Sequence, residues 1–82
     1  MRSEKVTVEG RDFEVNELTI GQALPILPRM QGETAAQAQI DLLNACVKES
    51  GAEVIVSELP FSMFTPLLSA AMNVNGFSSS GG

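Results

Sequence analysis

The feature that most constrains this chain is its last third, because residues 59–82 carry no charged side chain. All fifteen charged residues lie in the first fifty-eight positions. A helix in contact with water normally carries charges on its outer face, so a helix without any is expected to be covered by the rest of the chain or by another protein. Three of the four Phe and two of the four Met residues also lie here. We therefore look for a binding surface in this segment first.

The residue types present argue against catalysis. The chain has no histidine, which removes the commonest general base and metal ligand and any Ser/His or Cys/His pair. Its single cysteine, Cys46, lies in a helical apolar pattern and is expected to be a buried structural thiol. Asp12 and Glu14 are expected on a solvated hairpin edge, and the isolated or terminal glycines form no phosphate loop. We expect a protein that is not an enzyme and takes no cofactor or metal.

The charge balance limits the classes of partner. Ten acidic and five basic residues give a net charge of −5, whereas nucleic-acid binding requires Lys and Arg to displace counterions from phosphates. The same balance argues against anionic membrane surfaces. The longest uncharged stretch is interrupted by Pro60, Pro66, Asn73, Asn75 and several Ser, so it lacks the ~20 mainly apolar residues of a membrane span. The charged N-terminus lacks the apolar region of a secretory signal. These features predict an intracellular protein that binds neither nucleic acid nor membrane.

Residues 4–16 predict a β-hairpin. Apolar and polar residues alternate on both sides of a Glu-Gly-Arg turn, and Gly10 can take the positive φ angle that such turns require. Two strands alone are barely stable in water, so their apolar face is expected to lie on a helix. The residues of that face are Val6, Val8, Phe13 and Val15.

Residues 20–30 predict a short or broken helix. Thr19 and Gln22 have the spacing of a capping box, which favours a helix start. Pro25 and Pro28 follow, and each removes a hydrogen bond and crowds the preceding turn, at about 3 kcal/mol in a helix interior. We therefore expect the helix to be interrupted.

Residues 34–50 predict a longer helix, separated from the first by Gly32 as a left-handed cap. Thr34 and Gln37 repeat the capping-box spacing, and Gly51 is expected to close the helix. Apolar residues recur at intervals of four, three and four along one face. They are Ala36, Ile40, Leu43 and Val47.

The segment 52–58 is ambiguous, whereas residues 60–75 predict a final helix. The run Val54–Val56 favours a third strand joined to the hairpin, but its position after a helix and before a proline favours a short helical turn, which we prefer. The final helix is expected to begin between Pro60 and Pro66, with Ser62 or Thr65 as its cap; Thr65 followed by Pro66 fits a cap and the first helical position. Its apolar face follows helical spacing and comprises Phe64, Leu67, Leu68, Ala71 and Met72.

These elements predict an α+β fold, with a small N-terminal β-hairpin packed on a bundle of about three to four helices. A single globular domain is expected over residues 1–77, followed by a flexible Ser/Gly tail at 78–82. A domain of this size buries only about 60–65% of the surface that its unfolded chain exposes. Such limited burial leaves a small margin of stability, to which a partner or self-association could add.

The candidate partner-binding residues lie in the uncharged segment. Leu67, Leu68 and Ala71 are expected to fill the core against the 34–50 helix, whereas several apolar neighbours occupy flanking positions. Methionine adapts to varied partners, which suits a chaperone-like surface. The residues that we predict to contact a partner are Phe61, Met63, Phe64, Met72 and Phe77. Another apolar set could extend this surface, namely Ile26, Leu27 and Met30.

Four sequence pieces, taken in order, carry a resemblance to a known family. They are FEVNELTIGQ at 13–22, LLNAC at 42–46, ELP at 58–60 and VNGF at 74–77. Over residues 5–77, the chain resembles the small tail assembly chaperones of long-tailed bacteriophages and Mu-like prophages. The two prolines at positions 25 and 28 depart from the family, because they interrupt a segment where relatives are expected to have a continuous helix.

The resemblance implies a function without catalysis, in the cytoplasm of the bacterial host. Such chaperones coat the tape measure protein, a long and aggregation-prone helical chain, before the tail tube polymerises around it. They help to recruit tail tube protein and are not expected in the mature virion. In many phages the gene also yields a longer product by ribosomal frameshifting, for which the Ser/Gly tail would suit a flexible junction.

Two other classes fit the same low mass, acidity and lack of catalytic residues. One is a small phage-encoded inhibitor or regulator that binds a host protein. The other is a minor structural component of the tail, such as a tail-completion protein. Gene position would distinguish the first from a chaperone, and mass spectrometry of purified particles would distinguish the second.

Overall fold

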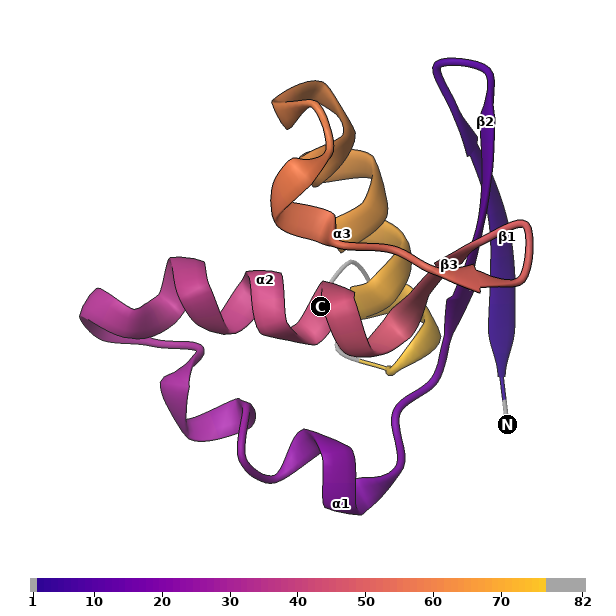
Figure 1. The fold of residues 1–82 in the computed structure, drawn as a ribbon. Helices are drawn as coiled ribbons and strands as arrows, with labels where there is room; N and C mark the ends of the chain where they lie inside the picture. The colour runs from indigo at the N-terminus through magenta and orange to yellow at the C-terminus, as the bar shows by residue number, and fades with distance from the viewer. Residues whose placement is uncertain (1, 77–82) are drawn as a thin grey trace.

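The structure, a computed structural model, describes residues 2–76 and has the α+β class expected from the sequence. Four antiparallel strands form one sheet in the order β1-β2-β3-β4. Figure 1 shows α2 and α3 on one side of this sheet, with α1 below α2. The fold is therefore an N-terminal hairpin, extended by two short strands, that packs against helices.

The hairpin forms as predicted, from β1 (Ser3–Val8) and β2 (Arg11–Asn16). The two turn residues, Glu9 and Gly10, have φ angles of 52° and 81°. Positive φ at both central positions matches the right-handed twist of the strands in a two-residue turn. The prediction of a hairpin with a left-handed glycine is confirmed.

The two faces of the sheet differ in chemistry. The face toward the helices carries buried apolar residues from three strands, namely Val8, Phe13, Val15 and Val47. On the other face, residues of alternating charge stand directly opposite one another across the four strands, in the order Lys5, Glu14, Lys48 and Glu53. Opposite charges at facing positions avoid repulsion between neighbouring strands.

Helix α1 (Ile20–Ala23) is short, and the chain continues through the 3₁₀ turn η1 (Leu27–Arg29). The predicted capping box is present: the Gln22 amide donates to the Thr19 hydroxyl at 3.1 Å, and the Thr19 amide donates to the Gln22 side chain at 2.9 Å. The helix stops before Pro25, which cannot supply the next backbone donor. The predicted break is confirmed.

Helix α2 (Ala35–Cys46) ends four residues before the predicted boundary. Strand β3 (Val47–Glu49) follows at once and pairs with β2, so that Val47 lies opposite Val15. The helical spacing of Val47 was therefore misleading: a β-branched residue is better placed on a sheet, where its backbone groups also pair with a free strand edge.

The residues predicted to cap the 34–50 helix, Thr34 and Gly51, have other roles in the structure. Thr34 closes the 3₁₀ turn η2 (Gly32–Thr34), and its hydroxyl donates to the Arg29 carbonyl at 2.9 Å rather than capping α2. Gly51, with φ of 82°, forms the turn from β3 to β4 (Ala52–Glu53) instead of closing a helix. Gly32 does take the predicted left-handed conformation, with φ of 77°.

The ambiguous segment 52–58 contains both alternatives. Its first two residues form β4, the strand that joins the sheet, and its end forms the 3₁₀ turn η3 (Val56–Glu58). The Val56 amide donates to the Asn44 side-chain oxygen at 2.9 Å, which ties η3 to α2. The preferred helical turn is thus correct for the last residues only.

The last helix, α3 (Phe64–Val74), follows the 3₁₀ turn η4 (Phe61–Met63). Neither Ser62 nor Thr65 is the cap, because Met63 holds that position. Pro66 is then the third residue of the helix, where a backbone donor has no partner inside the helix. The outer face of α3 is exposed rather than covered. It carries uncharged residues, namely Thr65, Pro66, Ser69 and Asn73.

The core lies where α2 and α3 meet each other and the sheet (Figure 1). Leu67 and Ala71 are fully buried, as predicted, and Leu68 is half-buried. Asn75 fastens the end of α3 to the chain before α1: its side-chain oxygen accepts from the Leu18 amide at 2.7 Å, and its amide donates to the Ala71 carbonyl at 2.9 Å. One side chain therefore joins distant parts of the domain.

Candidate functional site

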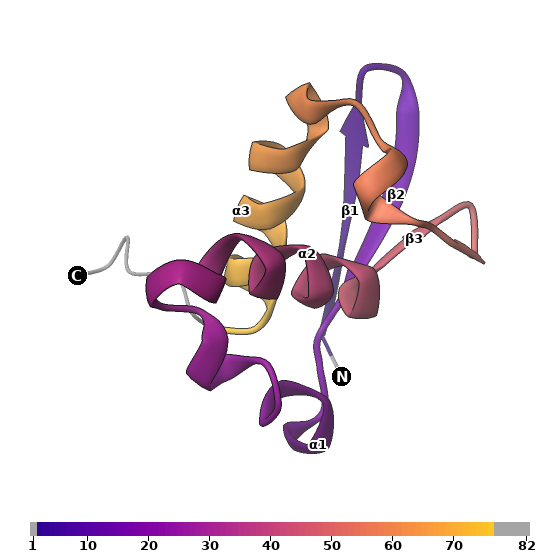
Figure 2. The same ribbon diagram turned by 60° about the vertical axis from the view of Figure 1, so that its left-hand side comes forward.

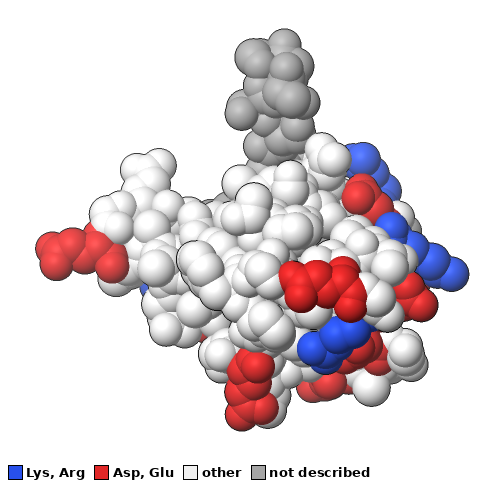
Figure 3. Space-filling view, turned by 90° about the horizontal axis from the view of Figure 1, so that it is seen from above, with Lys and Arg blue, Asp and Glu red and all other residues white. Residues whose placement is uncertain are grey.

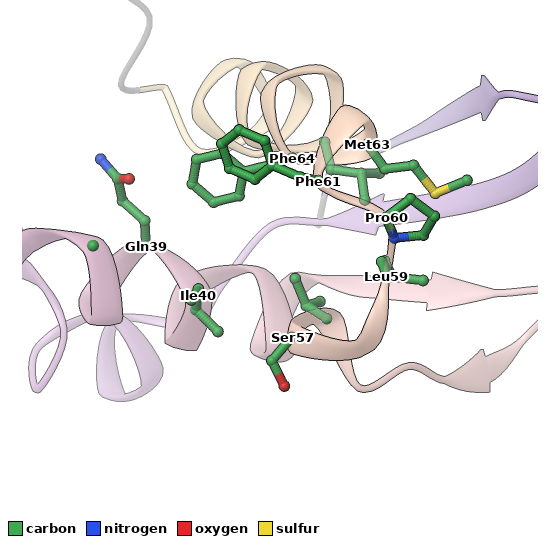
Figure 4. Close-up of a pocket in the computed structure, with 11 residues that line it drawn as sticks. Gln39, Ile40, Ser57, Leu59, Pro60, Phe61, Met63 and Phe64 are labelled. Atoms are coloured by element: carbon green, nitrogen blue, oxygen red, sulfur yellow. The ribbon is translucent and has the colours of Figure 1, made fainter.

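An apolar groove lies between the first half of α2 and the segment that leads into α3 (Figure 4). Its volume is about 370 Å³, and none of the residues that line it is charged. We call it the α2–α3 groove. Its lining residues are Ala36, Gln39, Ile40, Val56, Ser57, Leu59, Pro60, Phe61, Met63, Phe64 and Leu67.

Two walls and a floor can be distinguished in Figure 4. One wall is a single face of α2, where Ala36 and Ile40 are one helical turn apart. The other wall is the connection 59–64, which Pro60 holds extended with φ of −56° and ψ of 143°. The floor includes Met63, which is only 2% exposed. The groove is thus built on the domain core and is backed by rigid elements.

The rim of the groove carries an aromatic pair. Phe61 is 86% exposed, so almost nothing in residues 2–76 covers its ring. The ring stacks on Phe64, with centroids 5.9 Å apart and an angle of 10° between the planes. Figure 4 shows the two rings projecting from the start of α3 toward α2. An aromatic ring so exposed beside an apolar hollow is typical of a surface that a partner covers.

The five predicted contact residues do not all lie in this groove. Phe61, Met63 and Phe64 line it, although Met63 forms its floor rather than projecting from it. Met72 is half-buried and packs against the core, outside the groove. Phe77 lies outside the described residues, as does the Ser/Gly tail.

The α2 wall was missed by the sequence reasoning. The spacing of Ala36 and Ile40 placed them on the predicted core face, together with Leu43. Leu43 is indeed buried, but Ile40 is half-buried and Ala36 is exposed. The side chains that α2 buries are Ala38, Leu42, Leu43 and Cys46, so the core face is turned relative to the predicted one and shares only Leu43 with it inside the helix.

The residues around the groove are acidic rather than basic. The Ser62 hydroxyl, next to Phe61, donates to the Glu9 carboxylate, which places the tip of the hairpin beside η4. Glu58 is exposed at the end of η3, next to the lining residue Leu59. In Figure 3 acidic side chains, with several basic ones beside them, stand around a broad uncharged surface. A partner that enters the groove therefore meets a negative rim.

Two ion pairs hold the fold and lie outside the groove. Arg11 donates to both carboxylate oxygens of Glu49, at 2.8 and 2.6 Å, and lies over the Phe13 ring at 5.5 Å. The hydrogen bond from Arg11 lowers the pKa of Glu49, and the same bond raises the pKa of Arg11. This ion pair lies beside Phe13, at the end of the buried sheet face that is nearest to the hairpin turn.

The second ion pair joins η1 to α2. The Arg29 guanidinium donates to Asp41 at 2.6 Å, and the Gln37 amide donates to the same carboxylate at 3.1 Å. The hydrogen bond from Arg29, followed by that from Gln37, holds the pKa of Asp41 below its usual range. Within residues 2–76, no group of three or more acidic or cysteine side chains is placed to hold a metal ion.

Cys46 is buried at the end of α2, as the sequence predicts. Burial raises the pKa of its thiol, and the hydrogen bond from the Asn75 amide, at 3.6 Å from Sγ, opposes this only in part. The thiol therefore stays protonated near neutral pH, which is unfavourable for a nucleophile.

None of the helices in the described part of the chain is long and apolar enough to span a membrane. Comparison with protein-family models, with curated proteins and with solved structures found no match to this chain.

Proposed function

We propose that this protein is a non-catalytic chaperone that takes up an amphipathic helix of another protein in its α2–α3 groove. The observation that carries the proposal is the ring of Phe61, 86% exposed at the rim of an uncharged apolar hollow. Helix-in-groove binding uses apolar residues of a helix at positions i, i+3, i+4 and i+7 as anchors. A hollow of about 370 Å³ has room for one or two such side chains at a time.

The negative charge of the protein indicates which charges the partner helix carries. The net charge is −5, and the exposed Glu58 adjoins the groove. A partner helix with Lys or Arg beside its apolar face would be attracted to this rim and would associate faster at low ionic strength. An acidic helix would be repelled. The groove itself contains no charge, so that the apolar face of the partner would be buried without an unpaired ion.

We further propose that the partner is a phage tape measure protein and that the complex supports assembly of the tail tube. The resemblance of residues 5–77 to tail assembly chaperones supports this assignment. A long helical chain exposes apolar stripes until it is packed, and many small acidic proteins bound along it would cover these stripes and keep it dispersed. The protein would act in the host cytoplasm and leave the tail before the virion is complete.

Co-expression of this chain with the gene for the tape measure protein tests the proposal. Soluble tape measure protein should be obtained with the wild-type chain and lost with Phe61→Glu, which puts a charge on the rim of the apolar groove. Ile55→Glu is the matched control, because Ile55 is 61% exposed and does not line the groove. If Phe61→Glu stays folded and the soluble yield is unchanged, the groove is not the binding site. Recovery of a host protein instead of the tape measure would favour the inhibitor class.

A further inference from the structure

A second exposed apolar surface lies on α1 and η1. Ile20, Leu24 and Leu27 are 79%, 62% and 40% exposed; Ile20 begins α1, Leu24 caps its end and Leu27 begins η1. The opposite side of the same segment packs inward, where Ile26 is buried and Ala23 is half-buried. This segment therefore leaves three large apolar side chains exposed to solvent. We call them the apolar stripe.

The apolar stripe has the chemistry that the α2–α3 groove accepts. Residues 18–28 contain no charge, so the stripe could enter an uncharged groove without burying an ion. The chain thus carries both a hollow and a segment of the kind that fits it.

The two surfaces lie on opposite sides of α2. Figures 1 and 2 both place α1 on one side of α2 and the start of α3 on the other. The ion pair from Arg29 to Asp41 fixes the α1 side, whereas Ala36 and Ile40 face the groove. The stripe therefore cannot reach the groove of its own chain, but it can reach that of a neighbouring copy.

We infer that copies of this protein associate head to tail, with the apolar stripe of one copy in the α2–α3 groove of the next. Because the two surfaces differ, the contact is heterologous and leaves a free stripe at one end and a free groove at the other. Further copies can then add. A contact made by three side chains in one groove is expected to be small beside the ~1,200 Å² of stable interfaces, so association should be reversible and concentration-dependent.

Two consequences separate this association from binding of a partner helix. Each copy has a net charge of −5, so added salt screens the repulsion and strengthens self-association. A basic partner helix would instead bind less tightly as salt rises. The docked stripe also occupies the groove assigned to the partner, so that the two should compete. The inference does not rest on the proposed function, because it holds whether or not a partner helix exists.

Sedimentation equilibrium over a range of protein and NaCl concentrations tests the inference. The wild-type mean mass should rise with both concentrations. Leu24→Glu damages only the stripe and Phe61→Glu only the groove, and both side chains are exposed in the free chain. Each variant alone should associate about tenfold or more weakly than the wild type, because a charge enters an apolar contact. Ile55→Glu adds the same charge outside both surfaces and should behave as the wild type, with far-ultraviolet circular dichroism confirming the fold of every variant.

An equimolar mixture of the two variants gives the decisive result. The intact stripe of Phe61→Glu can enter the intact groove of Leu24→Glu, so the mixture should form a dimer that does not grow further. A mixture that stays monomeric overturns the inference, as does a Phe61→Glu or Leu24→Glu variant that associates like the wild type. A wild-type chain that is monomeric at all concentrations overturns it too. If Leu24→Glu fails to fold, Ile20→Gln replaces it, because Ile20 is the most exposed residue of the stripe.

Discussion

The substitution Phe61→Ala should separate binding from folding. Because its ring is 86% exposed, Phe61 contributes little to the folded chain beyond its stacking on Phe64. A stacked aromatic pair is worth about 0.5–1.5 kcal/mol when buried, and less than about 1 kcal/mol is expected for this exposed pair. The free energy of unfolding should therefore change by less than about 1 kcal/mol.

The loss of partner binding should be larger. Full burial of a Phe side chain contributes about 1.5–3 kcal/mol, and most of this remains unused in the free chain because the ring is exposed. If the partner covers the ring, Phe61→Ala should weaken binding by about 2 kcal/mol. Since about 1.4 kcal/mol is a factor of ten, the dissociation constant should rise about 30-fold.

The assay is fluorescence anisotropy with a labelled amphipathic, Lys-flanked helical peptide, beside urea unfolding of the same variants. Ile55→Ala is the matched control, because it also removes an exposed apolar side chain but lies outside the groove. Its affinity for the peptide should equal that of the wild type. Met63→Ala contrasts with Phe61→Ala in stability, since the Met63 side chain is only 2% exposed and its loss should lower the free energy of unfolding by about 2–5 kcal/mol.

Two results would refute this reasoning. An unchanged affinity of a folded Phe61→Ala variant would mean that the partner does not cover the ring. A loss of more than about 2 kcal/mol in the free energy of unfolding would mean that the ring is buried in the free chain. Either result would remove the observation on which the proposed function stands.

Three further predictions concern the fold itself. Asn75→Ala should lower the free energy of unfolding by about 1–3 kcal/mol, measured with urea, because it leaves the buried Leu18 amide without its acceptor. Leu67→Ala should lower it by about 2–5 kcal/mol, since Leu67 is fully buried between α2 and α3. Because the pKa values of Glu49 and Asp41 are lower in the folded than in the unfolded chain, both carboxylates stabilise the fold above their unfolded pKa values of about 4. This stabilisation is lost as the pH falls through the folded pKa values. The midpoint temperature of unfolding should therefore decrease when the pH is lowered below about 4, and Glu49→Gln should make that decrease smaller.

The parts of the fold that were predictable are those set by local chemistry. The alternation around Gly10 defines the hairpin, and Pro25 stops α1 whatever surrounds it. The end of α2 was not predictable in this way. Val47 fits the helical spacing of Ile40 and Leu43, and only its pairing with distant Val15 places it in a strand. Pairing between segments more than thirty residues apart leaves no local pattern in the sequence.

The candidate site was predictable on one wall only. The cluster of Phe and Met residues after Leu59 pointed to the segment that forms the second wall and the rim. The α2 wall depends on which face of α2 is buried. That face carries Ala38, Leu42 and Cys46, so Leu43 at its edge is buried and Ile40 lies beyond it. The spacing of Ile40 and Leu43 fits a helical face equally well, so the pattern alone did not show which face packs on the core.

The absence of charge after Leu59 has two different causes. Along α3, buried Leu67 and Ala71 exclude charge on the inner face, while Ser69 and Asn73 meet water with uncharged polar groups on the outer face. Neither face needs a partner. Phe61 differs, because it is apolar and exposed at the same time. A charge at Ser69 should therefore be tolerated by both folding and binding, whereas a charge at Phe61 should abolish binding alone. The uncharged segment marks a binding surface only where the chain leaves an apolar side chain uncovered.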